Sequence, residues 1–181
     1  MRQIAILVSI LFLFTGCQPD TNKAEQQKNE ETKAAFERNS ETVLSMLASF
    51  ENEKPDYSMH ADDFVSRATG FGAEQDSIFL KDVKLMDKIN LERYDFKLLT
   101  NPPVLLPGVN PETNEMDGSV RYYVDWEVSK AATDSTPARS GIVKMYQSVD
   151  FNEAGKITYV QTYGDFTGLL LHLNNLIGNE N

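Results

Sequence analysis

The stretch SVRYYVDWEVS, residues 119–129, decides the fold class of this 181-residue chain. Apolar side chains fall on every second position of this stretch, and the alternate positions hold arginine, tyrosine, aspartate and glutamate. A period of two places the apolar set on one face of a β-strand. We therefore expect one long strand with one face in a core, and the core-facing residues are Val120, Tyr122, Val124, Trp126 and Val128.

The segments that follow this strand predict an antiparallel meander. Residues 141–149 and 156–163 read as two further strands, and the turn residues 152–155 join them. Upstream, residues 96–100 predict a shorter strand that ends before two prolines. The apolar segment 169–177 is expected to pack against the sheet.

The N-terminal half predicts helices. Apolar residues at helical spacing indicate a first helix, capped by Asn39 or Ser40 and ended by Pro55. A second helix is expected to begin at Asp76 or Ser77. Helices that precede a run of long strands are typical of an α+β fold rather than of alternating α/β units.

The first seventeen residues are typical of an exported protein. Arg2 precedes an eleven-residue, almost wholly apolar run at residues 4–14, which is shorter than the ~20 residues of a spanning helix. The only cysteine, Cys17, follows directly, and residues 13–17 resemble the lipobox of bacterial lipoproteins. The resemblance implies lipidation of Cys17 and anchorage in the bacterial cell envelope, at the outer membrane if the source has two membranes. The alternative, a plain signal peptide, leaves an unpaired thiol on a secreted chain.

The charge distribution separates a tether from a domain. Residues 18–38 contain no Leu, Ile, Val or Met, so they should not fold alone, although many are good helix formers. The expected organisation is a signal peptide at 1–16, the lipidated cysteine with a polar tether at 17–38, and a domain at 39–181. The net charge of -10 excludes nucleic acid as a partner, because phosphate binding needs clustered Lys and Arg.

Several short sequence segments of the domain resemble those of SnoaL-like members of the nuclear transport factor 2 superfamily. The matching segments are residues 57–65, with Ala61-Asp62-Asp63, the strand around 123–126, and the closing hairpin at 150–157. The resemblance spans about residues 40 to 170. It implies an α+β cone, in which a curved antiparallel sheet packs against N-terminal helices and encloses a pocket.

The ketosteroid isomerases of this superfamily place a base and a protonated acid in that pocket. By resemblance, their base position falls near Ala68 and their acid position near Gln147. An alanine cannot abstract a proton, so we expect that chemistry to be absent.

Four other residues are candidates for catalysis. His60 is an acid–base candidate together with Asp62 or Asp63, as in some SnoaL-like cyclases and hydrolases. On an extended segment, His60 shares a face with Asp62 and not with Asp63. Asp165 is a candidate near the pocket mouth, or a turn residue. A non-catalytic role, with a partly buried histidine beside solvated carboxylates, is favoured over an acid–base pair.

Aromatic residues of the strands are candidates for lining the pocket, although plain core packing gives the same pattern. No metal site or cofactor is expected, and the oxygen-rich loop at residues 110–118 lacks the glycine and the closing glutamate of a calcium loop. The pocket-lining candidates are Tyr122, Trp126, Tyr146, Tyr159 and Tyr163.

Three functions remain open on the sequence alone. A noncatalytic domain that binds a small apolar ligand, displayed on a membrane, ranks first. A homodimeric assembly module that uses an exposed sheet face ranks second. A small isomerase, cyclase or hydrolase that uses His60 with Asp62 or Asp63 ranks third, because no complete catalytic set is present.

Overall fold

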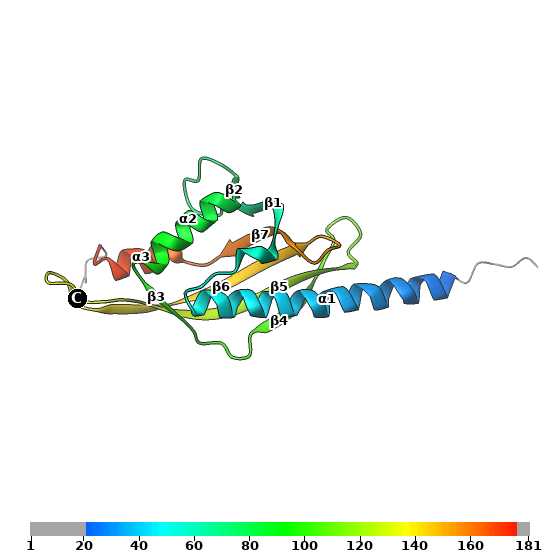
Figure 1. The fold of residues 1–181 in the computed structure, drawn as a ribbon, viewed down its shortest axis with the longest axis horizontal. Helices are drawn as coiled ribbons and strands as arrows, with labels where there is room; N and C mark the ends of the chain where they lie inside the picture. The colour runs from blue at the N-terminus through cyan, green and yellow to red at the C-terminus, as the bar shows by residue number, and fades with distance from the viewer. Residues whose placement is uncertain (1–20, 177–181) are drawn as a thin grey trace, which may run out of the picture.

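Three α-helices and seven strands make up residues 21–176, the part of the chain that this computed structural model describes (Figure 1). Cys17 and the expected signal peptide lie outside these residues. The helices are α1 (Thr21–Glu51), α2 (Leu80–Leu91) and α3 (Phe166–Leu173), with a short 3₁₀ turn at Tyr57–Met59. The strands are β1 (His60–Arg67), β2 (Ser77–Phe79), β3 (Asp95–Leu98), β4 (Val104–Val109), β5 (Met116–Lys130), β6 (Arg139–Phe151) and β7 (Ile157–Tyr163).

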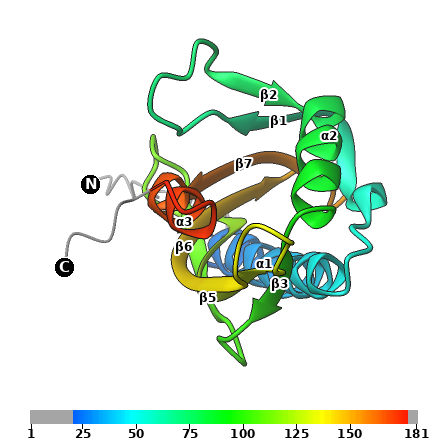
Figure 2. The ribbon, with the colours of Figure 1, turned by 90° about the vertical axis from the view of Figure 1, so that its left-hand side faces the viewer.

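The strands form one curved sheet in the order β2-β1-β7-β6-β5-β3, and β4 pairs with β5 beside β3. Figure 2 shows the sheet curling from β2 to β3 while α1 and α2 lie on its open side. This arrangement confirms the expected α+β cone. The expectation of a purely antiparallel sheet needs one correction: β1 pairs with β7 in parallel, so the sheet is mixed.

The alternation that predicted β5 is confirmed residue by residue. Along this strand the odd-numbered side chains from Arg121 to Glu127 are half-buried or exposed, on the face away from the core. The strand is longer than expected because its ends pair with β4 and with Arg139 on β6. Every core-facing side chain is at most 5% exposed, namely Val120, Tyr122, Val124, Trp126 and Val128.

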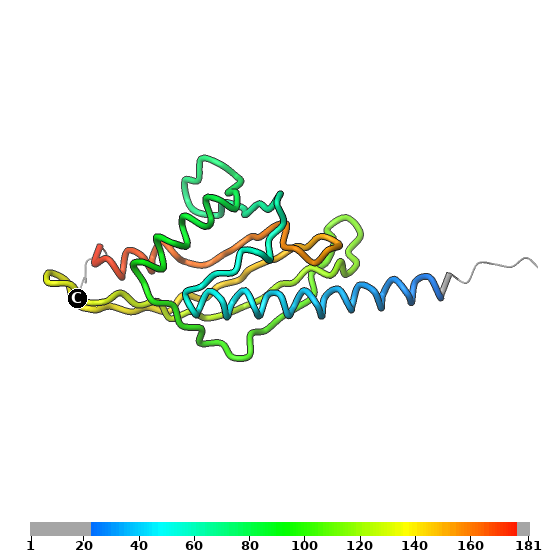
Figure 3. Tube along the Cα trace, viewed as in Figure 1, coloured from blue at the N-terminus to red at the C-terminus, as the bar shows by residue number. Residues whose placement is uncertain are grey.

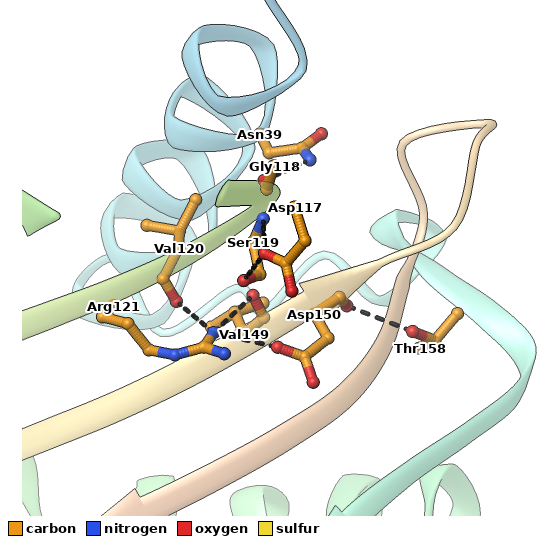
Figure 4. Close-up of polar contacts among 9 residues, drawn as sticks. All are labelled: Asn39, Asp117, Gly118, Ser119, Val120, Arg121, Val149, Asp150 and Thr158. Carbon is orange, nitrogen blue, oxygen red and sulfur yellow. Dashed lines mark hydrogen bonds and ion pairs between the residues drawn. The ribbon is translucent and has the colours of Figure 1, made fainter. Parts of the chain in front are cut away.

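The first helix begins much earlier than expected. It starts at Thr21, so residues 21–38 are helical and continuous with the segment that packs on β5. Asn39 and Ser40 therefore do not cap a helix but lie in its middle. Asn39 is 2% exposed, and its Nδ2 donates to the carbonyl of Gly118 at 2.8 Å (Figure 4). This tertiary hydrogen bond offsets the weak helix propensity of asparagine.

The second helix begins later than expected, at Leu80 rather than after Asp76 or Ser77. Residues 77–79 pair with β1 instead, with Phe79 opposite Val65. Sheet pairing therefore overrides the capping pattern of the sequence. No pattern in the sequence indicated β4, because prolines surround and interrupt it. Pro107 is tolerated there because, in the described part of the chain, β4 pairs with β5 alone.

Candidate functional site

A pocket of about 390 Å³ lies between the concave face of the sheet and all three helices. Its size falls in the range of small-molecule sites. Most of its surface is apolar, with Phe50 from α1, Met86 from α2 and Leu169 from α3 facing Trp126 and Met145 on the sheet. The hollow of the core is thus open to a ligand rather than filled by side chains.

A tyrosine–aspartate pair lies at the α2 side of this pocket. The Oη of Tyr57 donates to Oδ2 of Asp87 at 3.0 Å. Burial raises the pKa of the Asp87 carboxyl, and the hydrogen bond from Tyr57 opposes that rise. Burial and then the charge of Asp87 raise the pKa of Tyr57. Lys84 places its Nζ 5.0 Å from the centre of the Tyr57 ring, outside the pocket lining.

His60 lines the same side of the pocket. Its ring packs edge-on against the ring of Phe64, with 4.6 Å between the ring centres, and its buried Nδ1 has no hydrogen-bond partner among residues 21–176. Burial lowers the pKa of His60, so the imidazole is neutral near pH 7. A neutral histidine in an apolar wall contributes polarity without charge.

A row of three polar side chains crosses the sheet on the pocket face. Tyr122 on β5 is in register with Gln147 on β6, and Gln147 is in register with Thr162 on β7. The Oη of Tyr122 donates to Oε1 of Gln147, whose Nε2 donates to Oγ1 of Thr162. Burial raises the pKa of Tyr122, so its phenol stays protonated. We call these three residues the polar row.

The acid–base pair suggested by the sequence is not assembled at the pocket. His60 lines it, but Asp62 and Asp63 are exposed, and neither carboxylate contributes to the lining. The irregular pairing of β1 with β7 between His60 and Val65 breaks the simple alternation that put Asp62 beside His60. Asp165 caps α3, where its Oδ1 accepts from the backbone N–H of Gly168 at 2.8 Å.

Two of the five aromatic candidates line the pocket, Tyr122 and Trp126. The other three do not belong to the lining of this pocket, because strand register places them on the outer face of the sheet. There Tyr146 lies 6.4 Å from Tyr163, ring centre to ring centre, and Tyr159 is four residues from Tyr163 on the same strand. Whether a residue faces the pocket is therefore decided by its place in the alternation along the strand, and not by its being aromatic.

The sequence did not single out the Tyr57–Asp87 pair. The sequence of α2 contains a pattern that could have indicated Asp87. At helical spacing, one face of this helix lines the pocket with Val83, Met86, Asp87 and Asn90. A carboxylate within the apolar stripe of a helix indicates a buried acid. Within residues 21–176, no group of three or more His, Cys, Asp or Glu side chains is arranged to hold a metal ion.

Solved structures with a similar fold are known, although no family model matches the chain and no curated protein is similar to it in sequence. A putative polyketide cyclase from Xanthomonas campestris pv. campestris has a TM-score of 0.58 at 14% identity, over 77% of this chain and 98% of that one. The BvnE pinacolase from Penicillium brevicompactum has a TM-score of 0.56 at 15% identity, over 77% and 93% of the two chains. A nuclear transport factor 2-like protein from Burkholderia xenovorans has a TM-score of 0.55 at 13% identity, over 76% and 97%.

These similarities support a domain with the nuclear transport factor 2-like fold of the SnoaL-like proteins, as the resemblance in sequence implied. At such low identity they bear on the fold alone. The same scaffold hosts many functions, so the pocket itself must indicate what it takes.

Proposed function

From this fold and its pocket, we propose that the chain is a membrane-anchored extracytoplasmic lipoprotein whose domain binds a small apolar molecule without transforming it. The observation that carries the proposal is the pocket of about 390 Å³ with a largely apolar lining and a few polar groups. Such a combination is typical of ligand sites, where apolar area gives affinity and isolated polar groups give orientation.

Binding is preferred over catalysis because the pocket lacks an assembled acid–base pair. Among the described residues no hydrogen bond joins His60 to a carboxylate: Asp56, which also lines the pocket, accepts from the backbone N–H of Ser58 at 2.8 Å, and Asp87 accepts from the Tyr57 hydroxyl. The similar structures include a putative cyclase and a pinacolase, so an enzyme remains the alternative. General acid–base chemistry requires a group within hydrogen-bond reach of the substrate, with a pKa near the working pH.

The long first helix supports the anchoring part of the proposal. It begins at Thr21, four positions after Cys17, and residues 23–31 are exposed. Figure 3 shows this part of α1 reaching beyond the sheet. At 1.5 Å per residue, residues 21–38 span about 27 Å. A lipid on Cys17 would place this helix as a spacer between bilayer and domain. None of the helices within residues 21–176 is long and apolar enough to cross a membrane.

Native mass spectrometry of the protein purified without detergent tests the binding function. We expect a population with the mass of one bound small molecule. Met145→Trp, which fills the pocket from β6, should remove that mass, whereas Lys144→Trp, one position along on the exposed face, should keep it. A protein that carries no extra mass and gains none from a panel of apolar compounds would refute the proposal.

A homodimer is the second candidate, and the outer sheet face favours it. Tyr123, Ile142 and Tyr163 are 52%, 59% and 48% exposed there. Large apolar side chains gathered on one exposed face often mark an interface. Sedimentation at increasing concentration should give a dimer that Ile142→Glu weakens. A constant monomer mass up to high concentration would exclude self-assembly.

A further inference from the structure

Asp87 is a carboxylate in the wall of a largely apolar pocket, and no ion pair within residues 21–176 neutralises it. We propose that the ligand is an organic ammonium ion, an apolar body with one protonated amine, whose N–H groups donate to Oδ1 of Asp87. This inference rests on the proposed binding function and adds the charge of the ligand.

One oxygen of Asp87 has no hydrogen-bond donor within the described residues. The Tyr57 hydroxyl donates to Oδ2 at 3.0 Å, and no group of residues 21–176 donates to Oδ1. A carboxylate has about four lone-pair sites, so Oδ1 can still accept hydrogen bonds. Asp87 is half-buried and lines the pocket, and a carboxylate removed from water is costly without a partner. A ligand that brings a donor into the pocket would remove this cost.

The lysines that neighbour Asp87 on α2 interact elsewhere. Lys84 places its Nζ 5.0 Å from the centre of the Tyr57 ring, outside the pocket lining. Lys88 places its Nζ 3.8 Å from Oε1 of Glu92. Among the described residues, no lysine or arginine belongs to the pocket lining. The protein therefore supplies no cation to Asp87 from inside the pocket, and a cationic ligand fits this position.

The other groups of the lining favour a cation or carry no charge. His60 is neutral near pH 7, because burial lowers its pKa, and the polar row is uncharged. A second carboxylate, Asp56, also lines the pocket. Aromatic rings form much of the remaining wall, and the face of such a ring attracts a cation. An anionic ligand would meet two carboxylates and no cation, so the lining selects against it.

Three naphthalenes of similar shape test the charge of the ligand: 2-(aminomethyl)naphthalene, which is protonated at pH 7, the uncharged 2-naphthylmethanol and the anion 2-naphthoate. The chain has one tryptophan, Trp126, which lines the pocket, so its single indole N–H signal in an NMR spectrum reports binding. We expect the ammonium ion to bind about 5- to 10-fold more tightly than the alcohol, because a charge-assisted hydrogen bond is roughly twice as strong as a neutral one. We expect naphthoate to bind more weakly than the alcohol.

Two variants of α2 connect that preference to Asp87. Asp87→Asn removes the charge and keeps an oxygen that can accept from the Tyr57 hydroxyl, so the fold is retained. It should lower the affinity for the ammonium ion to that for the alcohol and leave the affinity for the alcohol nearly unchanged. Asp82→Asn removes the same charge from the same helix outside the pocket lining and should preserve the preference.

The outcomes separate this inference from the proposed function. If the alcohol or naphthoate binds as tightly as the ammonium ion, or if Asp87→Asn keeps the preference, the inference fails while the binding function stands. If Asp82→Asn reduces the preference as much as Asp87→Asn does, the net charge of -10 attracts the cation rather than a contact with Asp87, and the inference is overturned. If none of the three compounds shifts the indole signal and no bound mass is found, the proposed binding function itself fails.

Discussion

Asn39 joins the middle of α1 to the start of β5. Its amide nitrogen donates to the Gly118 carbonyl, and Gly118 has a φ of +80°, a conformation that favours glycine. A Cβ at position 118 would lie 3.0 Å from that of Ala35, so the helix and the strand approach closely. In the neighbouring contacts of Figure 4, Arg121 pairs with Asp150 at 2.9 Å. The short residue at 118 and the amide at 39 thus position α1 on the sheet.

Asn39→Ala should lower the free energy of unfolding by about 1–3 kcal/mol, because the buried Gly118 carbonyl loses its donor. Urea unfolding followed by Trp126 fluorescence measures the change. Asn29→Ala, the same substitution at an exposed position of the same helix, should leave stability nearly unchanged. Equal effects of the two variants would show that the hydrogen bond contributes nothing.

Asp87→Asn should stabilise the protein at neutral pH. Burial raises the pKa of Asp87 above its ordinary value of 3.8, so the folded state binds a proton more tightly than the unfolded state. The cost of the buried carboxylate is absent below pH 3.8, grows as pH rises through the folded pKa and is full above it. The stability gain of Asp87→Asn should therefore increase with pH.

Urea unfolding between pH 4 and pH 8 measures that increase. Asp63→Asn, at an exposed position of β1, is the matched control and should show no comparable rise. A gain from Asp87→Asn that is constant across this range would contradict the raised pKa.

At the scale of elements, α1 is one helix with two environments. In its first part, residues 23–31 are all exposed. One exposed ion pair links this part to the loop between β4 and β5: Nζ of Lys28 lies 2.6 Å from Oε2 of Glu115. Its second part buries Val43 and Leu47 in the core. Tertiary packing therefore stabilises the second part, whereas helix propensity carries most of the first.

Proline substitutions should separate these two parts. Ser45→Pro removes a helix hydrogen bond in the packed part and should cost about 3 kcal/mol or more. Gln27→Pro disrupts the exposed part and should leave the unfolding midpoint of the domain almost unchanged. Circular dichroism and Trp126 fluorescence, followed through the same urea titration, distinguish local from global loss. A large shift of the midpoint by Gln27→Pro would show that the first part stabilises the domain.

At the scale of the whole molecule, the curved sheet produces both the pocket and an exposed outer face. The same strands present Tyr122 and Met145 inward and Tyr123 and Tyr146 outward. The net charge of -10 makes the domain unsuited to lie flat on an anionic bilayer. A spacer helix between a lipid anchor and this domain is consistent with that charge.

Cys17→Ser tests the proposed anchor. Without a thiol to acylate, the chain should remain unprocessed or move to the soluble fraction, since anchoring by lipid requires the acyl chains. Membrane fractionation with a blot for the domain measures the distribution. Thr15→Ser, a conservative change in the same segment, should leave attachment intact. Unchanged membrane attachment of Cys17→Ser would refute lipidation.

Much of the fold was predictable because it depends on local periodicity. The alternation around Val124 identified the central strand and its core face, and the order of helices and strands predicted the α+β class. The expected ends of the helices were wrong where pairing with another strand competes with the local capping preference. Ser77, for example, pairs with Arg67 on β1 instead of capping α2. The parallel pairing of β1 with β7 likewise joins segments about a hundred residues apart.

The sequence by itself determined which residues are apolar, how they alternate, and therefore that a sheet packs on helices around a core. Only the tertiary structure decided which polar groups share the pocket: Tyr57 meets Asp87 30 positions away, and Tyr122 meets Gln147 25 positions away. The physical reason is that strand register and helix docking are set by the packing of the whole chain, and a shift of one residue turns every side chain of a strand to the other face.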